Sequence, residues 1–354
     1  MENILKHWLP PGLVCGVLVA VAGFSTPRVD AVLQPAPDAQ MKAVLDELAK
    51  LGPKPLEKLT PAEARSQPTP ADAVMALLKR EGKSTAPEPV GRIEDRTIPG
   101  AAGSIPARVY WPKGDGPFPV VLYIHGGGWV IATLDTYDSS ARALTNAANA
   151  VVVSTHYRQA PEHKFPAAHD DTYAAYKWVV ANATSINGDP GRVAVAGESA
   201  GGNMAANVSI RARDEKQQMP VHQVLVYPVA ESSFNTPSYQ ENAIAKPLSK
   251  AAMMWFAKHY LKSEQEGKDP RITLIAANLK GLPATTIITA QIDPLRSEGQ
   301  MLGERLKAAG VDVTVRNYDG VAHEFFGMGA VVDKAKDAVE VAAAGLKRGF
   351  MQKR

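Results

Sequence analysis

The feature that most constrains this chain is a strand-like run that ends in a glycine-rich turn and passes directly into a helical pattern. Val and Ala alternate over residues 193–196, the turn reads GESAG at residues 197–201, and an Ala- and Met-containing helical pattern follows. So sharp a turn leaves no room for Cβ atoms beside the serine, which accounts for the glycines on both sides of it. The pattern predicts that Ser199 lifts its hydroxyl clear of the backbone, at the positive end of a helix.

Composition narrows the classes of protein that this turn could belong to. A chain of 354 residues with 45% hydrophobic and 21% charged residues is long enough for one large α/β domain plus a small accessory element. The formal charge of +3 is small and is concentrated only at the last few residues, so we expect no nucleic-acid partner. Cys15 is the only cysteine, which excludes an intramolecular disulfide and a multi-cysteine metal site.

Strand and helix patterns alternate along most of the chain, which predicts a mostly parallel sheet of eight strands covered by helices on both faces. The expected strands are Arg92–Ile98, Ile105–Trp111, Phe118–Ile124, Ala150–Tyr157, Arg192–Ala196, His222–Tyr227, Thr285–Ala290 and Val311–Tyr318. The expected helices are Ala167–Val180, a helix from Ala200 onward, Glu298–Ala309 and Val331–Leu346. The fold class is therefore α/β, with a catalytic domain expected over residues 91–354.

Residues 1–30 carry the pattern of an export signal. Lys6 precedes an apolar run from Gly12 to Phe24, which is too short to span a bilayer comfortably but suits the core of a signal peptide. We therefore expect an exported protein, periplasmic or secreted. The alternative is a cytoplasmic protein whose hydrophobic N-terminal helix lies on the domain or on a membrane surface, and membrane contact is expected only through this segment.

Two further segments predict small helical elements outside the sheet. Residues 36–90 contain an amphipathic pattern over Asp38–Leu51 and two similar helix starts, Thr60-Pro61 and Thr69-Pro70, each with an acidic residue two positions after the proline. Residues 229–275 form an insert too long for a plain loop, with a helical pattern around residues 248–256. Taken alone, the N-terminal segment could be a separate module or a lid.

A second glycine-rich motif follows the expected strand Phe118–Ile124. It reads HGGGW at residues 125–129, and three consecutive glycines imply backbone that another group approaches closely. Acyl transfer needs amide N–H groups aimed at a developing oxyanion, and glycine amides supply them without steric bulk. A flexible loop is the plainer interpretation of the same residues.

Two more candidate groups stand just beyond later strands. Asp293 follows the strand at Thr285, and His323 follows the strand at Val311. The carboxyl ends of parallel strands meet at one edge of a sheet, so Ser199, Asp293 and His323 can converge there. The chain order Ser, Asp, His is that of α/β-hydrolases and differs from the order in other serine enzymes.

These motifs together resemble those of the hormone-sensitive-lipase-like branch of bacterial carboxylesterases, family IV, which has the α/β-hydrolase fold with a helical cap. The resemblance covers the chain from about residue 36 to its end, through HGGGW, YRQAPEHKFPAA at 157–168, GESAGG at 197–202, DPLR at 293–296 and GVAHEFF at 320–326. It implies Ser199 as nucleophile, His323 as base and Asp293 as its partner. It also implies an oxyanion hole made by the amides of Gly127, Gly128 and Ala200, and a cap built from residues 36–90 and the insert.

The expected activity is hydrolysis of short- to medium-chain carboxylic esters through an acyl-enzyme, by a monomer or a homodimer acting on a small-molecule ester. An amidase or a hydrolase of one natural ester would carry the same three residues. A ligand-binding protein on an inactive scaffold is less favoured, because such proteins typically lack one of the three.

Some positions depart from the family pattern or could suggest other chemistry. The family usually has Asp at Glu198, commonly Leu at Gln159 and often an acid at Ser297. We expect Glu198 to hold the 157–162 loop by hydrogen bonds. No cofactor is expected, and no metal site, because the one cluster of candidate ligands lacks ligand spacing. That cluster comprises His163, His169, Asp170 and Asp171.

Overall fold

The computed structural model describes residues 35–352, so the hydrophobic segment predicted at residues 1–30 lies outside the described residues. Eight strands form one sheet in the order β1-β2-β4-β3-β5-β6-β7-β8. Their bounds are β1 Arg92–Gly100, β2 Gly103–Trp111, β3 Phe118–Ile124, β4 Val151–Thr155, β5 Gly188–Glu198, β6 Gln223–Val226, β7 Thr285–Ile292 and β8 Val313–Ala322. Strand β2 runs antiparallel to both β1 and β4, and every other neighbouring pair is parallel. The predicted α/β fold with a mostly parallel eight-stranded sheet is confirmed.

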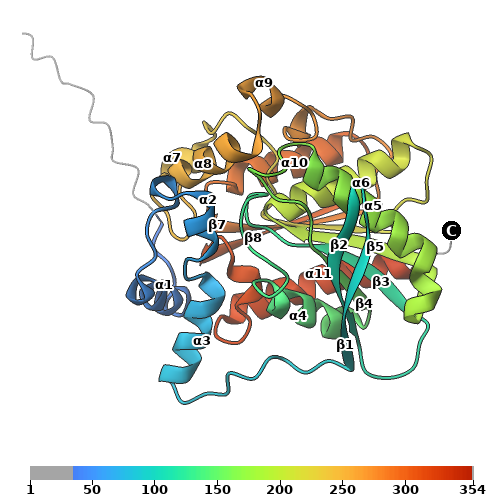
Figure 1. Cartoon of the computed structure of the whole chain (residues 1–354), viewed down its shortest axis with the longest axis horizontal. Coiled ribbons are helices and arrows are strands. Elements are labelled where there is room, and N and C mark those ends of the chain that lie inside the picture. Colours follow the sequence, from blue (N-terminus) through green and yellow to red (C-terminus); the bar gives the residue numbers. More distant parts are fainter. Residues whose placement is uncertain (1–34, 353–354) are drawn as a thin grey trace, which may run out of the picture. The chain divides into compact units, whose positions relative to one another are not determined.

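The helices cover both faces of this sheet. Their bounds are α1 Ala39–Leu51, α2 Pro61–Arg65, α3 Pro70–Arg80, α4 Asp138–Ala148, α5 Ala167–Asn182, α6 Ala200–Asp214, α7 Pro237–Glu241, α8 Lys250–Tyr260, α9 Glu264–Gly267, α10 Arg296–Ala308 and α11 Asp333–Met351. In Figure 1, α5, α6 and α10 lie on one side of the strands, and α4 and α11 lie on the other. Alternate residues of β3 accordingly face two cores: Val120 and Leu122 pack with the first group, Val121 and Tyr123 with the second.

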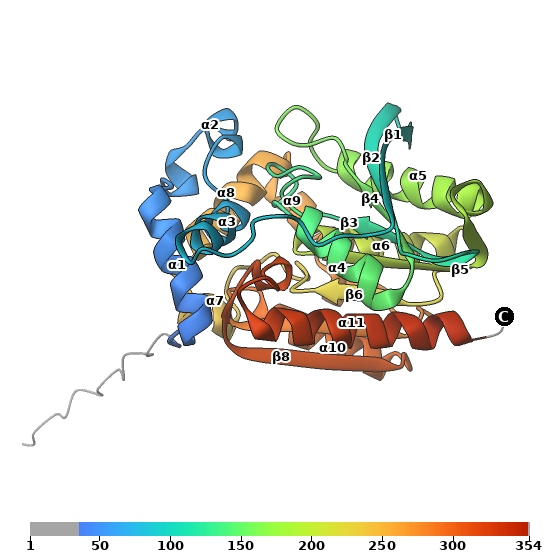
Figure 2. The ribbon, with the colours of Figure 1, turned by 90° about the horizontal axis from the view of Figure 1, so that it is seen from below.

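Helices α1–α3 from the N-terminal segment and α7 and α8 from the insert lie together beyond one end of the sheet (Figures 1 and 2). Thr60 and Thr69 each cap their helix through a complete capping box with the acidic residue three positions later, as the sequence predicts. The Trp255 indole of α8 donates to the Leu59 carbonyl at 3.0 Å, which joins the two segments. We call these five helices and their connecting loops the cap.

Helix α4 was not predicted from the sequence. Its buried side chains are small or polar apart from one leucine, and no side chain caps its first residue. The apolar spacing of Ala141, Leu144 and Ala148 is compatible with a helix, but alanine alone is a weak sign of a buried face. Helix α4 is stabilised by packing against β2, β4 and, above all, α11, which lies almost two hundred residues further along the chain.

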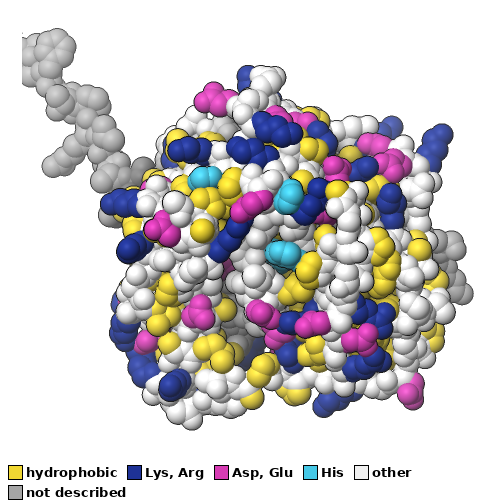
Figure 3. Space-filling view, in the orientation of Figure 1, with side chains coloured by type: hydrophobic (Ala, Val, Ile, Leu, Met, Phe, Trp, Pro, Cys, Tyr) yellow, Lys and Arg dark blue, Asp and Glu magenta, His cyan; other side chains and the backbone are white. Residues whose placement is uncertain are grey.

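Positive and negative side chains are intermixed on the face shown in Figure 3, so the small net charge is not concentrated there. Within residues 35–352 no helix is long and apolar enough to cross a membrane.

Candidate active site

Ser199 stands on the strained turn between β5 and α6. Its backbone has φ 57° and ψ −120°, a left-handed conformation that residues other than glycine rarely adopt. A Cβ atom on Gly197 would collide with the Gly201 carbonyl, and one on Gly201 would collide with the Ile124 carbonyl. The turn therefore depends on both glycines, and it places the serine at the first turn of α6, where the helix dipole favours negative charge.

The three residues singled out from the sequence meet above the carboxyl ends of the strands. His323 Nε2 lies 3.0 Å from Ser199 Oγ, and His323 Nδ1 lies 2.7 Å from Asp293 Oδ2. The other carboxylate oxygen of Asp293 accepts the Leu295 amide at 2.9 Å. The structure thus brings together all three members of the predicted triad, each at least 95% buried. Their catalytic roles stay predictions.

The charge environment of His323 suits a general base. Burial is the largest single influence and lowers the pKa of the imidazole, but the Asp293 carboxylate facing Nδ1, together with Glu324 and Glu198, outweighs it. The pKa of His323 is therefore raised above its ordinary value. With its Nδ1 proton donated to Asp293, the neutral ring presents the Nε2 lone pair to the Ser199 hydroxyl. The arrangement can accept the hydroxyl proton and stabilise the resulting imidazolium.

The HGGGW loop supplies free amide groups beside the serine. Gly127 and Gly128 have φ of 90° and 57°, and a Cβ on Gly128 would collide with the Phe256 ring of the cap. Within residues 35–352 neither amide donates to another protein group, and both residues line the same pocket as Ser199. The Ala200 amide belongs to the first turn of α6, where backbone N–H groups have no helical partner. The oxyanion hole at these three amides stays a prediction that this geometry allows.

A pocket of about 330 Å³ opens onto Ser199 and His323 between the sheet and the cap. Both cap segments form its walls, and most of the lining is apolar. Among the lining residues are Leu48, Pro55 and Leu56 from the N-terminal segment and Leu248, Met253 and Phe256 from the insert. A site of this kind suits a small apolar substrate whose reacting group reaches the serine.

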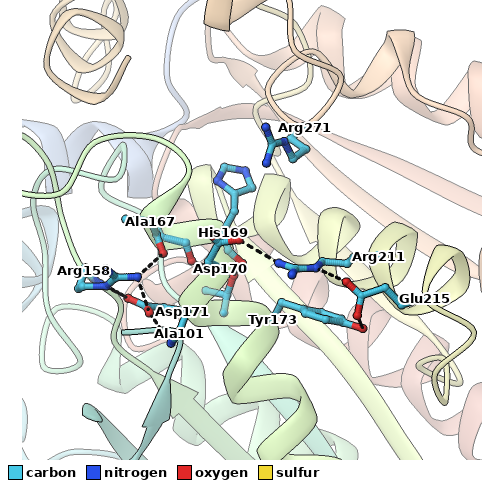
Figure 4. Close-up of polar contacts among 12 residues, drawn as sticks. Ala101, Arg158, Ala167, His169, Asp170, Asp171, Tyr173, Arg211, Glu215 and Arg271 are labelled. Atoms are coloured by element: carbon cyan, nitrogen blue, oxygen red, sulfur yellow. Dashed lines mark hydrogen bonds and ion pairs between the residues drawn. The ribbon is translucent and has the colours of Figure 1, made fainter. Parts of the chain in front are cut away.

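The loop at residues 157–162 is held by a residue that the sequence did not single out for this role. Asp171 is fully buried, and its carboxylate accepts Arg158 Nε at 2.8 Å, Arg158 Nη2 at 3.0 Å and the Ala101 amide at 2.9 Å (Figure 4). At the other side of the loop, the Tyr157 hydroxyl donates to the Gly126 carbonyl at 2.7 Å. These contacts fix the loop against the HGGGW motif.

The prediction that Glu198 holds this loop is wrong. Glu198 Oε1 accepts the Tyr123 hydroxyl at 2.5 Å, and its other oxygen accepts the Tyr227 hydroxyl. Glu198 is the last residue of β5, and its side chain points to the face of the sheet that α4 and α11 cover, where Tyr123 and Tyr227 lie. It therefore makes no contact with residues 157–162. Burial, together with the charge of Glu324, raises the pKa of Glu198 to about 7.

The cluster of His and Asp side chains at residues 163–171 has no common centre, because its members contact different partners. His169 contacts the Tyr260 hydroxyl at 2.7 Å. Asp170 pairs with Arg211 at 2.9 Å, and Asp171 pairs with Arg158 (Figure 4). The side chains of His169, Asp170 and Asp171 therefore serve structural contacts, whereas His163 is exposed. Among the described residues, no group of three or more His, Cys, Asp or Glu side chains could hold a metal ion.

Removing the Asp171 carboxylate is expected to destabilise the fold. In Asp171→Ala the partly exposed Arg158 guanidinium and the Ala101 amide lose their buried acceptor. The expected loss is about 3 kcal/mol in the free energy of unfolding. Urea unfolding followed by circular dichroism measures it. The neighbouring Asp170→Ala is the control, because its pair with Arg211 is exposed and is worth at most about 1 kcal/mol. Equal losses in the two variants would contradict the role of Asp171.

Known proteins resemble this chain over most of its length. A family model described as the alpha/beta hydrolase fold matches residues 121–327. The chain is 42% identical over 292 residues to the carboxylesterase NlhH of Mycobacterium tuberculosis, covering 80% of this chain and 91% of that protein. It is 41% identical over 262 residues to the esterase LipI of the same organism, covering 72% of this chain and 82% of that protein.

Solved structures show the same likeness over nearly the whole described region. A hyperthermophilic esterase from Pyrobaculum calidifontis superposes with a TM-score of 0.80 at 37% identity, covering 89% of this chain and 98% of that one. The metagenomic carboxylesterase EstE1 superposes with a TM-score of 0.77 at 39% identity, covering 83% of this chain and 99% of that one. The chain therefore belongs to the α/β-hydrolase family, in the hormone-sensitive-lipase-like branch that contains these carboxylesterases.

Proposed function

We propose that this protein is a serine carboxylesterase that hydrolyses short- to medium-chain carboxylic esters through an acyl-enzyme. The observation that carries the proposal is the continuous contact from Asp293 through His323 to Ser199 at the base of an apolar pocket. A protein that only binds a ligand on an inactive scaffold would not need both the Asp293–His323 and the His323–Ser199 contacts. The carboxylesterase relatives support the same reaction class.

The proposed reaction has two steps. Ser199 Oγ attacks the ester carbonyl as His323 Nε2 takes its proton, and the resulting oxyanion faces the amides of Gly127, Gly128 and Ala200. His323 then gives the proton to the departing alcohol, which leaves an acyl group on Ser199. Water attacks the acyl-enzyme with His323 again acting as base, and the acid is released.

The size of the pocket supports a preference for small acyl groups. A volume of about 330 Å³ is near the lower end of ligand pockets, and the Phe256 ring of the cap lies directly against Gly128. For p-nitrophenyl esters from acetyl to palmitoyl, we expect kcat/KM to be highest at short to medium chains and to fall steeply toward palmitoyl. A maximum at the longest chains would contradict the proposed substrate class.

A matching anilide series separates the esterase from an amidase with the same triad. We expect the p-nitrophenyl esters to be cleaved and the corresponding p-nitroanilides to remain intact. Cleavage of none of these compounds, while a fluorophosphonate still labels Ser199, would indicate an enzyme for one particular natural ester.

We also propose that residues 1–30 direct export of the protein, and that it acts as a monomer or a homodimer. The support for export is the apolar run from Gly12 to Phe24 after Lys6 in the sequence. The mass of the protein recovered from cell fractions would show whether the segment is removed. Light scattering on the purified protein would give its oligomeric state.

A further inference from the structure

Glu324 occupies a position beside the catalytic histidine that the reaction above does not use. It directly follows His323 and has φ 71°, in the left-handed region that glycine adopts more easily than glutamate. A glutamate is therefore held there at a conformational cost, which its contacts must offset. Its side chain is 21% exposed and lines the substrate pocket together with Ser199 and His323.

The carboxylate of Glu324 is fixed next to the reacting nitrogen. Its Oε1 accepts the Tyr137 hydroxyl at 2.7 Å and lies 3.8 Å from His323 Nε2. Tyr137 is buried at the start of α4. Because its hydroxyl is held by the packed interior, the hydrogen bond fixes the position of Glu324 Oε1. The imidazole thus has Asp293 at Nδ1 and Glu324 near Nε2.

The groups around His323 are mainly acidic, so the protonated imidazole is the cation that faces these carboxylates. Glu198, at the end of β5, accepts hydrogen bonds from the Tyr123 and Tyr227 hydroxyls. The centroid of the Tyr227 ring lies 4.4 Å from the centroid of the His323 imidazole. Within residues 35–352, no Lys or Arg forms an ion pair with Asp293, Glu324 or Glu198. A positive charge on His323 is therefore the one charge among these contacts that can balance the acids.

We propose that Glu324 is a positioning residue for the reaction, whose carboxylate stabilises the protonated form of His323 from the side of Nε2. This inference rests on the proposed function. During attack by Ser199, the proton and its positive charge arrive at Nε2, and the attraction to Glu324 Oε1 grows as they do. Asp293 contributes from the far side of the ring and cannot replace this contact, because it faces Nδ1.

The test is the pH dependence of two reactions in wild type and in Glu324→Gln, which has nearly the same shape without the charge. The first is kcat/KM for p-nitrophenyl butyrate, and the second is the rate at which a neutral fluorophosphonate labels Ser199. In both we expect the acid limb to move down by about one pH unit, because removal of a nearby negative charge lowers the pKa of His323. At the plateau we expect both rates to fall roughly threefold to tenfold. The midpoint of the acid limb gives an apparent pKa that belongs jointly to the interacting His323, Glu324 and Glu198 groups.

Glu340→Gln is the matched control, because it removes the same charge from an exposed position on α11. Its profiles are expected to coincide with those of wild type. Tyr137→Phe keeps the charge but releases the carboxylate, and is expected to lower the plateau with a smaller displacement of the limb. If Glu324→Gln does not fold, Tyr137→Phe carries the test alone, and wild-type profiles in that variant would then overturn the inference.

The two reactions separate the possible failures. If the fluorophosphonate labels wild type but Glu324→Gln gives an unchanged limb and plateau, the inference is wrong and the proposed function stands. If the wild type is neither labelled nor active on the ester, the proposed function itself is wrong.

Discussion

Replacing Ser199 with alanine is expected to reduce kcat for p-nitrophenyl butyrate about 10⁶-fold, the size of loss found when the serine of such a triad is removed. The physical reason is that His323 then has no hydroxyl to activate, and only the amides and the pocket act on the substrate. The side chain is small and lies on an existing turn, so the alanine variant should fold. Initial rates at saturating ester, with matched unfolding curves, measure the effect.

The control for this variant is Ser185→Ala, an exposed serine whose hydroxyl contacts only a nearby backbone carbonyl. It is expected to retain wild-type turnover. If Ser199→Ala kept more than a small fraction of the activity, a nucleophile other than Ser199 would have to perform the reaction. Labelling by a fluorophosphonate would then also persist in the variant.

Asp293→Asn is expected to lower kcat about 10⁴-fold with little loss of stability. Two N–H groups donate to the carboxylate, from Leu295 at one oxygen and from His323 Nδ1 at the other. An asparagine has one acceptor oxygen, and satisfying the buried Leu295 amide turns its NH₂ group toward Nδ1. The proton of the imidazole is then driven to Nε2, where it blocks acceptance of the Ser199 proton.

The measurement for Asp293→Asn is kcat over a range of pH, together with the KM of the same ester. We expect KM to change little, because the carboxylate is fully buried and does not line the pocket. A variant with near wild-type kcat would show that the orientation of His323 is set by other contacts, for example by the Tyr227 ring.

Much of this site could be predicted from the sequence because its backbone requirements are local. The glycines around Ser199 and in HGGGW are needed wherever main-chain atoms approach within a few ångströms, and such positions stand out in a sequence. The strands were predicted for a similar reason, since short continuous apolar runs between helical patterns are typical of strands buried in a parallel sheet. Helix α4 was missed because its face consists of small side chains.

The sequence by itself determined the fold class, the strained turn at Ser199 and the order in which Ser199, Asp293 and His323 reach one edge of the sheet. It did so because backbone sterics and hydrophobic period are properties of neighbouring residues. Only the tertiary structure decided that Asp171 rather than Glu198 holds the 157–162 loop. The same is true of Glu324, whose carboxylate is held beside His323 by a hydrogen bond from Tyr137. The contact between Tyr137 and Glu324 joins residues far apart in the chain. For neighbours in the chain as well, the direction of a polar side chain is set by the partners that packing brings within reach.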